Sequence, residues 1–188
     1  MSINFLLLKV YDRILREQRG RQRGIAYGNK MSYTTNKERN KMAELIVRRA
    51  VEQDVDRIAE LEILCFKTPW TREAVHQDVV ENPRALYVVA EVEGLVIGYA
   101  GIWSIIDEGH ITNVAVDPRF RQHHVGSAII KVLLEVTEKA GIERHTLEVR
   151  RSNEPAIKLY EKFGFVVAGE RKGYYEDEGE DALIMWRD

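Results

Sequence analysis

Cysteine and long apolar runs are almost absent from this sequence of 188 residues. The single cysteine, Cys65, cannot form an internal disulfide. The longest apolar run near the start, residues 5–8, has four residues, whereas a membrane-spanning helix needs about 20 and the apolar part of a secretory signal about 7 to 15. The five histidines and the cysteine show no zinc-ligand spacing. We therefore expect a cytoplasmic protein with no membrane segment and no metal site.

An excess of one charge is also missing, because 28 Lys and Arg stand against 30 Asp and Glu. The two ends of the chain nevertheless differ. Residues 1–41 carry ten basic and three acidic side chains, a net charge of +7, which leaves 18 basic and 27 acidic side chains, or −9, for residues 42–188. Residues 1–41 also have few apolar side chains to bury, a composition typical of disorder. We expect a basic, disordered extension followed by one domain, residues 42–188, large enough for a single core.

The extension has two interpretations. A basic arm attracts phosphate without needing a fold, so residues 1–41 could bind nucleic acid or the ribosome. Alternatively, they are a dispensable extension and Met42, which immediately precedes the first strand-like run, is the natural first residue. We expect the second, with no direct nucleic-acid contact by the domain.

Strand-like and helical patterns alternate along residues 42–188. Alternation and β-branched content predict strands at residues 45–47, 85–93, 95–106, 110–116, 145–149, 165–175 and 182–186. Apolar spacing predicts helices at residues 53–65, 71–80, 125–140 and 155–163. Because hairpins, such as the one at Glu93-Gly94, are mixed with strand–helix–strand units, we expect an α/β fold whose sheet is mixed and flanked by helices.

The turn between the strand ending at Val116 and the helix beginning near Gly126 is a candidate anion site. A helix that opens directly after a strand exposes free backbone N–H groups and the positive end of its dipole. Arg119 and Arg121 add positive charge, and Gly126 lets the backbone come close to a ligand. The pattern suits a phosphate or pyrophosphate, although many ordinary helices begin in the same way.

Residues 146–165 form a second candidate region. Strand alternation puts Glu148 and Arg150 on the face opposite Leu147 and Val149. From the pattern alone, Glu148 would be a surface partner of Arg150, and Tyr160 an ordinary core residue of the following helix.

Taken together and in order, the motifs of residues 42–188 resemble the GNAT superfamily of acetyl-CoA-dependent N-acyltransferases. Within it they resemble the ribosomal-protein-alanine acetyltransferase (RimI) family. The similarity covers essentially all of residues 42–188 and is far more specific as a set than in any one motif. The motifs are Thr68-Pro69-Trp70, Asn113-Val114-Ala115-Val116-Asp117-Pro118, Leu147-Glu148-Val149-Arg150, Leu159-Tyr160 and Tyr174-Tyr175.

This resemblance implies a mostly antiparallel, V-splayed sheet with acetyl-CoA, the acetyl donor, in the cleft between the fourth and fifth strands. It makes Glu148 the general base and Tyr160 the general acid that protonates the leaving thiolate. It places the acceptor beside Trp70, Tyr174 and Tyr175. The residues that it aligns with acetyl-CoA are Val114, Ala115, Val116, Arg121, Gln122, His123, His124, Val125, Gly126, Ser127 and Asn153.

The implied reaction is acetylation of the α-amine of the N-terminal alanine of a small-subunit ribosomal protein. Two alternatives stay open: an acetyltransferase for a lysine side chain or a small-molecule amine, and a non-catalytic acyl-CoA-binding or ribosome-associated factor. The sequence leaves the oligomeric state open. It departs from the family pattern at His124, which stands where the family has the first glycine of its pyrophosphate loop. We expect His124 to have an ordinary negative φ and to offer its N–H to the phosphate.

Overall fold

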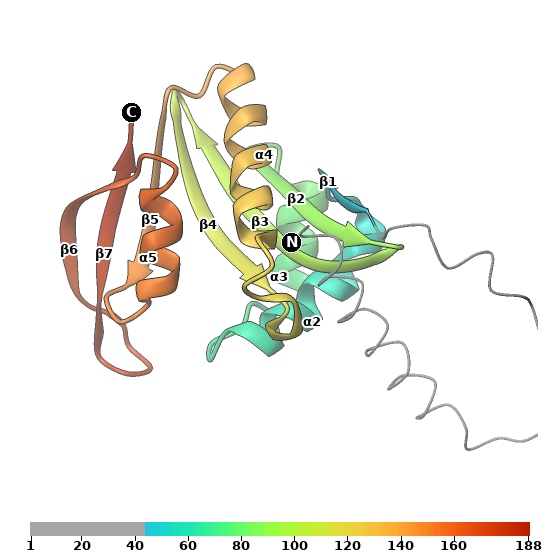
Figure 1. The fold of residues 1–188 in the computed structure, drawn as a ribbon, viewed down its shortest axis with the longest axis horizontal. Coiled ribbons are helices and arrows are strands. Elements are labelled where there is room, and N and C mark those ends of the chain that lie inside the picture. The colour runs from blue at the N-terminus through green and yellow to red at the C-terminus, as the bar shows by residue number, and fades with distance from the viewer. Residues whose placement is uncertain (1–43) are drawn as a thin grey trace, which may run out of the picture.

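The computed structural model describes residues 44–188, so the predicted extension, residues 1–41, lies outside the described residues. The described chain forms one mixed sheet with helices on both faces (Figure 1). Its strands are β1 (Leu45–Arg49), β2 (Ala85–Val92), β3 (Leu95–Ile105), β4 (Glu108–Val116), β5 (Arg144–Arg150), β6 (Val166–Tyr175) and β7 (Glu180–Arg187).

The helices follow the predicted segments closely. They are α2 (Val55–Cys65), α3 (Arg72–His76), α4 (Val125–Lys139) and α5 (Glu154–Glu161), with short turns η1 (Glu52–Asp54), η2 (Gln77–Glu81) and η3 (Pro118–Phe120). The predicted single helix at residues 71–80 is instead α3 followed by η2, a π-helical turn in which Asn82 N donates to Gln77 O at 2.9 Å.

The strand order is β1-β2-β3-β4-β5-β7-β6, and every neighbouring pair is antiparallel except β4 with β5. The parallel pairing is short, because only Glu108–Ile111 of β4 faces Arg144–Leu147 of β5. Beyond that point the two strands separate, as Figure 1 shows. Thr112, the next residue of β4, bulges out of register with β3. The predicted mixed, V-splayed sheet is confirmed.

Both faces of the sheet are buried, so β2 reads as a nearly continuous apolar run rather than an alternating one. One core lies between the sheet and α4 with α5, and includes Ile129, Leu133 and Tyr160. The other lies between the opposite face and α2 with α3, and includes Ile58 and Tyr99. Among residues 44–188 no helix is both long and apolar enough to cross a membrane.

Candidate active site

The separation of β4 from β5 leaves one edge of β4 without a neighbouring strand. On its other edge β4 pairs with β3, where Ala115 lies opposite Tyr99 and Asp117 N donates to Ile97 O at 2.9 Å. Because backbone groups of an antiparallel strand point alternately to its two edges, Val114 and Val116 direct theirs toward the open edge. Two of the three predicted strand positions therefore have backbone groups on the open edge, where the Val116 carbonyl is already bound by Arg121 and Cys65, whereas Ala115 is engaged with β3.

The loop from β4 to α4 presents backbone N–H groups to the same end of the strand. The first helical bond of α4 is Ala128 N to His124 O at 3.0 Å. The amides of Val125, Gly126 and Ser127 have no acceptor in the described chain. Three free amides at the positive end of a helix of 15 residues are an arrangement that favours an anion, as the sequence pattern predicts.

The expectation of an ordinary φ at His124 is wrong. Its φ is +61° and its ψ is +11°, and Gln122 also has a positive φ of +63°. The chain has to reverse between η3 and α4, and His124, the residue before the helix, makes that reversal in the left-handed conformation that the family's glycine would supply. Histidine enters this region more readily than β-branched residues, at a cost of about 1 kcal/mol.

Gly126 has a packing role as well. A Cβ at this position would lie 3.2 Å from Cδ2 of Leu159 in α5. The glycine therefore lets the first turn of α4 approach α5.

Arg121 lies in the loop from β4 to α4 and is exposed. Its Nε donates to Val116 O at 3.1 Å. The same carbonyl also accepts from Cys65 Sγ at 3.4 Å. His123 is partly buried in the same loop.

Glu148 lies on β5 one residue past Leu147, the last residue that pairs with β4. Its side chain is half-buried and accepts a hydrogen bond from Arg171 Nη1 at 2.8 Å. The strand pattern predicts that Glu148 pairs with Arg150, and this prediction is wrong. Arg150 instead forms ion pairs with Asp177, Glu178 and Glu180 in the hairpin between β6 and β7.

Tyr160 is buried in α5, with its ring 5.9 Å from that of Phe165. Burial, and to a smaller extent the nearby Tyr175, raises the pKa of its hydroxyl. That hydroxyl has no hydrogen-bond partner in the described chain. The hydroxyl of Tyr175 donates to the backbone carbonyl of Glu148 at 3.4 Å. Burial raises the pKa of Tyr175 to about 12, although Arg150, 4.0 Å above its ring, opposes this.

The predicted acceptor residues lie on two segments. Trp70, in the loop between α2 and α3, has its ring 6.3 Å from that of Trp103. Tyr174 is exposed and packs edge-on against Tyr175 at 5.1 Å. The two segments meet where Lys67 of the loop forms an ion pair with Glu178 of the β6–β7 hairpin. The carboxylates of this hairpin are therefore largely paired within the protein.

Asn153 begins α5. Its Oδ1 accepts from Ala156 N at 3.3 Å, so the side chain caps the helix. The Nδ2 group is then left for any contact with the cofactor.

Cys65 is half-buried, and burial raises the pKa of its thiol. This fits a structural thiol better than a nucleophile.

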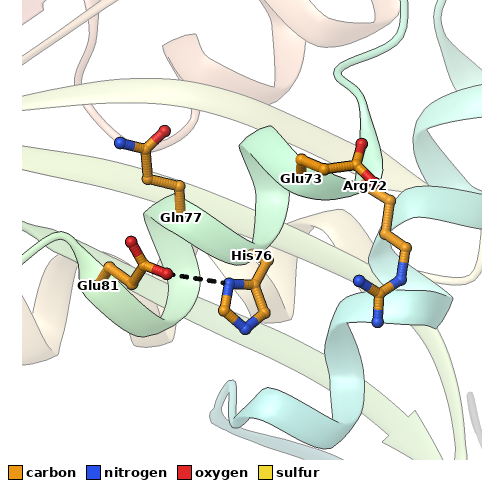
Figure 2. A pocket seen from close by; sticks show the side chains of 5 residues that line it. All are labelled: Arg72, Glu73, His76, Gln77 and Glu81. Atoms are coloured by element: carbon orange, nitrogen blue, oxygen red, sulfur yellow. Dashed lines mark ion pairs between the residues drawn. The ribbon is translucent and has the colours of Figure 1, made fainter.

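An open pocket elsewhere on the surface does not contribute to this site. Its lining residues come from α3 and η2, and Figure 2 shows the ion pair between His76 and Glu81 among them. The distance from His76 Nδ1 to Glu81 Oε1 is 3.4 Å. Within residues 44–188, no group of three or more His, Cys, Asp and Glu side chains could hold a metal ion.

Sequence reasoning missed Glu62, which is buried in α2 and accepts hydrogen bonds from Tyr99, Asn113 and the Trp70 amide. A signal was present, since Glu62 follows Ile58 by four residues and precedes Cys65 by three. It therefore stands on the inward face of the predicted helix. Arg171 gave no such signal, because its contact with Glu148 joins residues 23 positions apart.

Comparison with known proteins gives a consistent result. Residues 55–165 match the acetyltransferase (GNAT) family. A candidate ribosomal protein bS18-alanine N-acetyltransferase of Bacillus subtilis is 43% identical over 140 residues, which cover 74% of this chain and 93% of the relative. The ribosomal protein bS18-alanine N-acetyltransferase of Escherichia coli K12 is 35% identical over 119 residues, 62% of this chain and 79% of the relative.

Among solved structures, the ribosomal-protein-S18-alanine N-acetyltransferase of Escherichia coli superposes with a TM-score of 0.71 at 30% identity. The match covers 77% of this chain and 93% of that one. The splayed sheet, the free amides of α4 and these similarities lead to one assignment. This chain belongs to the acetyltransferase (GNAT) family, in its ribosomal-protein-alanine N-acetyltransferase branch, and is an N-acetyltransferase that uses acetyl-CoA.

Proposed function

We propose that this protein transfers the acetyl group of acetyl-CoA to the α-amine of the N-terminal alanine of a small-subunit ribosomal protein, in the cytoplasm. The observation that carries the proposal is the position of Glu148, on β5 directly after β4 and β5 separate. In this proposal Glu148 would serve the open edge of β4, where Val114 and Val116 would bind the pantetheine arm. The names of the two bacterial relatives support the choice of acceptor.

The donor would be held by backbone groups. The free amides of Val125, Gly126 and Ser127 would bind the pyrophosphate, with Gln122, His123 and His124 forming the preceding turn and Arg121 adding positive charge. Asn153 would lie on the far side of the cofactor. The N–H groups on the open edge of β4 would stabilise the oxyanion that forms at the thioester carbonyl.

The acceptor must lose a proton before it attacks. An α-amine of pKa near 8 is about one-tenth neutral at pH 7, whereas a lysine near 10.4 is less than about 0.1% neutral, so the α-amine is the easier acceptor. Glu148 would remove the proton through a water molecule. The amine nitrogen attacks the thioester carbon, the carbon–sulfur bond breaks, and the thiolate takes up a proton.

Tyr160 would supply that last proton. Because burial raises its pKa, the hydroxyl stays protonated at neutral pH, and no described residue competes for it. It can therefore donate a hydrogen bond to the sulfur as negative charge develops there.

Mass spectrometry tests the proposal. The purified protein is incubated with acetyl-CoA and a peptide carrying the N-terminal sequence of ribosomal protein bS18, beginning with alanine and containing a lysine. We expect one acetyl group on the α-amine and none on the same peptide with its α-amine blocked. Acetylation of the lysine in the blocked peptide at an equal rate would favour the lysine alternative. Acetyl-CoA binding without transfer to any amine would favour the non-catalytic alternative. A calorimetric titration that shows no binding up to millimolar acetyl-CoA would exclude both acetyltransferase interpretations.

A further inference from the structure

A buried carboxylate joins three segments beside the proposed acceptor site. Glu62 of α2 is 1% exposed. Its Oε1 accepts from the Tyr99 hydroxyl of β3 and from Asn113 Nδ2 of β4, the latter at 2.6 Å, and its Oε2 accepts from the backbone N of Trp70 at 2.8 Å. No lysine or arginine of the described chain pairs with Glu62. A buried polar group is tolerated where hydrogen bonds satisfy it, and the three bonds to Glu62 come from β3, β4 and the loop that carries Trp70.

The contact with Asn113 reaches the half of β4 that has separated from β5. Past Ile111 this half has only β3 beside it in the sheet, so its position also depends on α2. Besides Glu62, Cys65 Sγ contacts Val116 O at 3.4 Å and Arg57 Nη2 contacts Asp117 Oδ2 at 2.8 Å. The three contacts of α2 thus lie at Asn113, Val116 and Asp117, within or beside the segment in which Val114 and Val116 would bind the donor in the proposed reaction.

The contact with Trp70 reaches the acceptor side. The loop after α2 carries Trp70, and it also carries Lys67, which is paired with Glu178 of the β6–β7 hairpin. The ion pair of Lys67 connects the loop to the hairpin. The hydrogen bond from the Trp70 amide instead connects it to Glu62, the side chain that also contacts Asn113 of β4.

We propose that Glu62 is a positioning residue that fixes the loop of residues 66–71 relative to β4, so that the acceptor amine meets the thioester. This proposal rests on the proposed transferase function. A glutamine is nearly isosteric with Glu62 but keeps one accepting oxygen. Because two of the three donors, Tyr99 and Asn113, meet the same oxygen, we expect the glutamine oxygen to face them. Its NH₂ group then faces the Trp70 amide, two donors oppose each other, and the loop is released.

The test compares Glu62→Gln with Tyr99→Phe, which removes one hydrogen bond to Glu62 but leaves the Trp70 amide paired. Steady-state kinetics are measured with acetyl-CoA and the alanine peptide. In Glu62→Gln we expect the KM for the peptide to rise about tenfold or more, with the KM for acetyl-CoA within about twofold of wild type. In Tyr99→Phe the peptide KM should change less than about threefold. An equal rise of both KM values in Glu62→Gln, or an equal peptide effect in Tyr99→Phe, would overturn the proposal.

Hydrogen–deuterium exchange without substrate separates this proposal from the proposed function. Amides of residues 66–71 should exchange faster in Glu62→Gln than in Tyr99→Phe or wild type, and unchanged exchange would refute the role of Glu62 even in an active enzyme. If the wild-type protein acetylates no peptide, the proposed function is refuted. The exchange measurement still shows whether Glu62 holds the loop of residues 66–71.

If Glu62→Gln does not fold, Trp70→Pro and Trp70→Ala isolate the same bond, because both remove the indole but only proline removes the N–H. The proline variant should have the higher peptide KM, and equal values would overturn the proposal.

Discussion

The guanidinium of Arg171 donates a hydrogen bond to the carboxylate of Glu148, with 2.8 Å between Nη1 and Oε1. Arg171 comes from β6, and its guanidinium also lies 4.9 Å from the ring centre of Tyr174. The proposed base is therefore oriented from the neighbouring hairpin, and an incoming ammonium group meets a carboxylate that already has a cationic partner.

Replacing Glu148 with glutamine should lower kcat about 100-fold or more, because the amide cannot accept the proton from the acceptor amine. The initial rate of peptide acetylation measures the effect at saturating substrates. Glu154→Gln is the matched control, since Glu154 is an exposed residue of α5 whose nearest ionic partner, Lys158, is 3.4 Å away. A wild-type kcat in Glu148→Gln would remove Glu148 from the mechanism.

Arg171 should act through Glu148. Arg171→Ala leaves the carboxylate free to rotate, and we expect kcat/KM to fall about tenfold, since small misplacements of a reacting group cost up to about 100-fold. Arg171→Lys keeps a cation there and should recover part of the loss. The same loss in both variants would contradict a role for the charge.

Replacing Tyr160 with phenylalanine should also lower kcat about 100-fold or more. The change should scarcely affect the free energy of unfolding, because the hydroxyl has no hydrogen-bond partner in the described chain and the contact with Phe165 is kept. Urea unfolding and initial rates separate the two quantities. Tyr175→Phe loses only the 3.4 Å contact with the Glu148 carbonyl and should have a smaller effect on kcat. Equal rates for wild type and Tyr160→Phe would make Tyr160 a core residue only.

Deleting residues 1–41 should leave kcat/KM within about twofold of wild type, because every residue assigned to the reaction lies in the acidic part of the chain, residues 42–188. The assay compares the two proteins on the alanine peptide and on intact ribosomal protein. A large loss with the protein substrate alone would support the interpretation of the extension as a ribosome-binding arm. A loss with both substrates would make the extension part of the enzyme.

Replacing His124 with glycine should raise the free energy of unfolding by up to about 1 kcal/mol, because glycine adopts a φ of +61° without the steric cost that histidine carries. His124→Val should lower it by about 1 kcal/mol or more, since a β-branched side chain tolerates this region least. Urea unfolding measures both variants. Gln122→Gly is the matched control, as Gln122 has the same conformation. A lower free energy of unfolding in His124→Gly than in wild type would show that the left-handed conformation of His124 is not strained.

The fold could be predicted because its signals are local. The Glu93-Gly94 turn has φ values of +48° and +82°, as a tight hairpin requires, and the helices follow apolar periodicity. For the site, only the family motifs single out Glu148 and Tyr160, and their roles in the reaction stay predictions. The φ of His124 could not be predicted, because it depends on how the chain reverses between η3 and α4. Nor could the partners of Glu148, since Arg150 and Arg171 are equally charged and only the register of β6 on β7 decides which one reaches it.

His145 provides a test of stability against pH. It is fully buried on β5, and its Nε2 lies 2.8 Å from Thr137 Oγ1, which itself donates to the carbonyls of Leu133 and Leu134. Nε2 must therefore carry the proton, and Nδ1 has no partner in the described chain. Burial, together with the nearby Arg187, lowers the pKa of His145 below its usual value near 6.5.

Because the folded pKa is the lower one, the unfolded chain binds a proton between the two values and the folded protein does not. Stability is therefore fully present above about pH 6.5 and falls as the pH drops below it, by at most about 1.4 kcal/mol per pH unit from this group. Urea unfolding between pH 7.5 and 5.5 measures the slope. His145→Gln can still donate to Thr137 but does not titrate, so it should flatten the curve. Parallel curves for wild type and His145→Gln would show that another group sets the dependence.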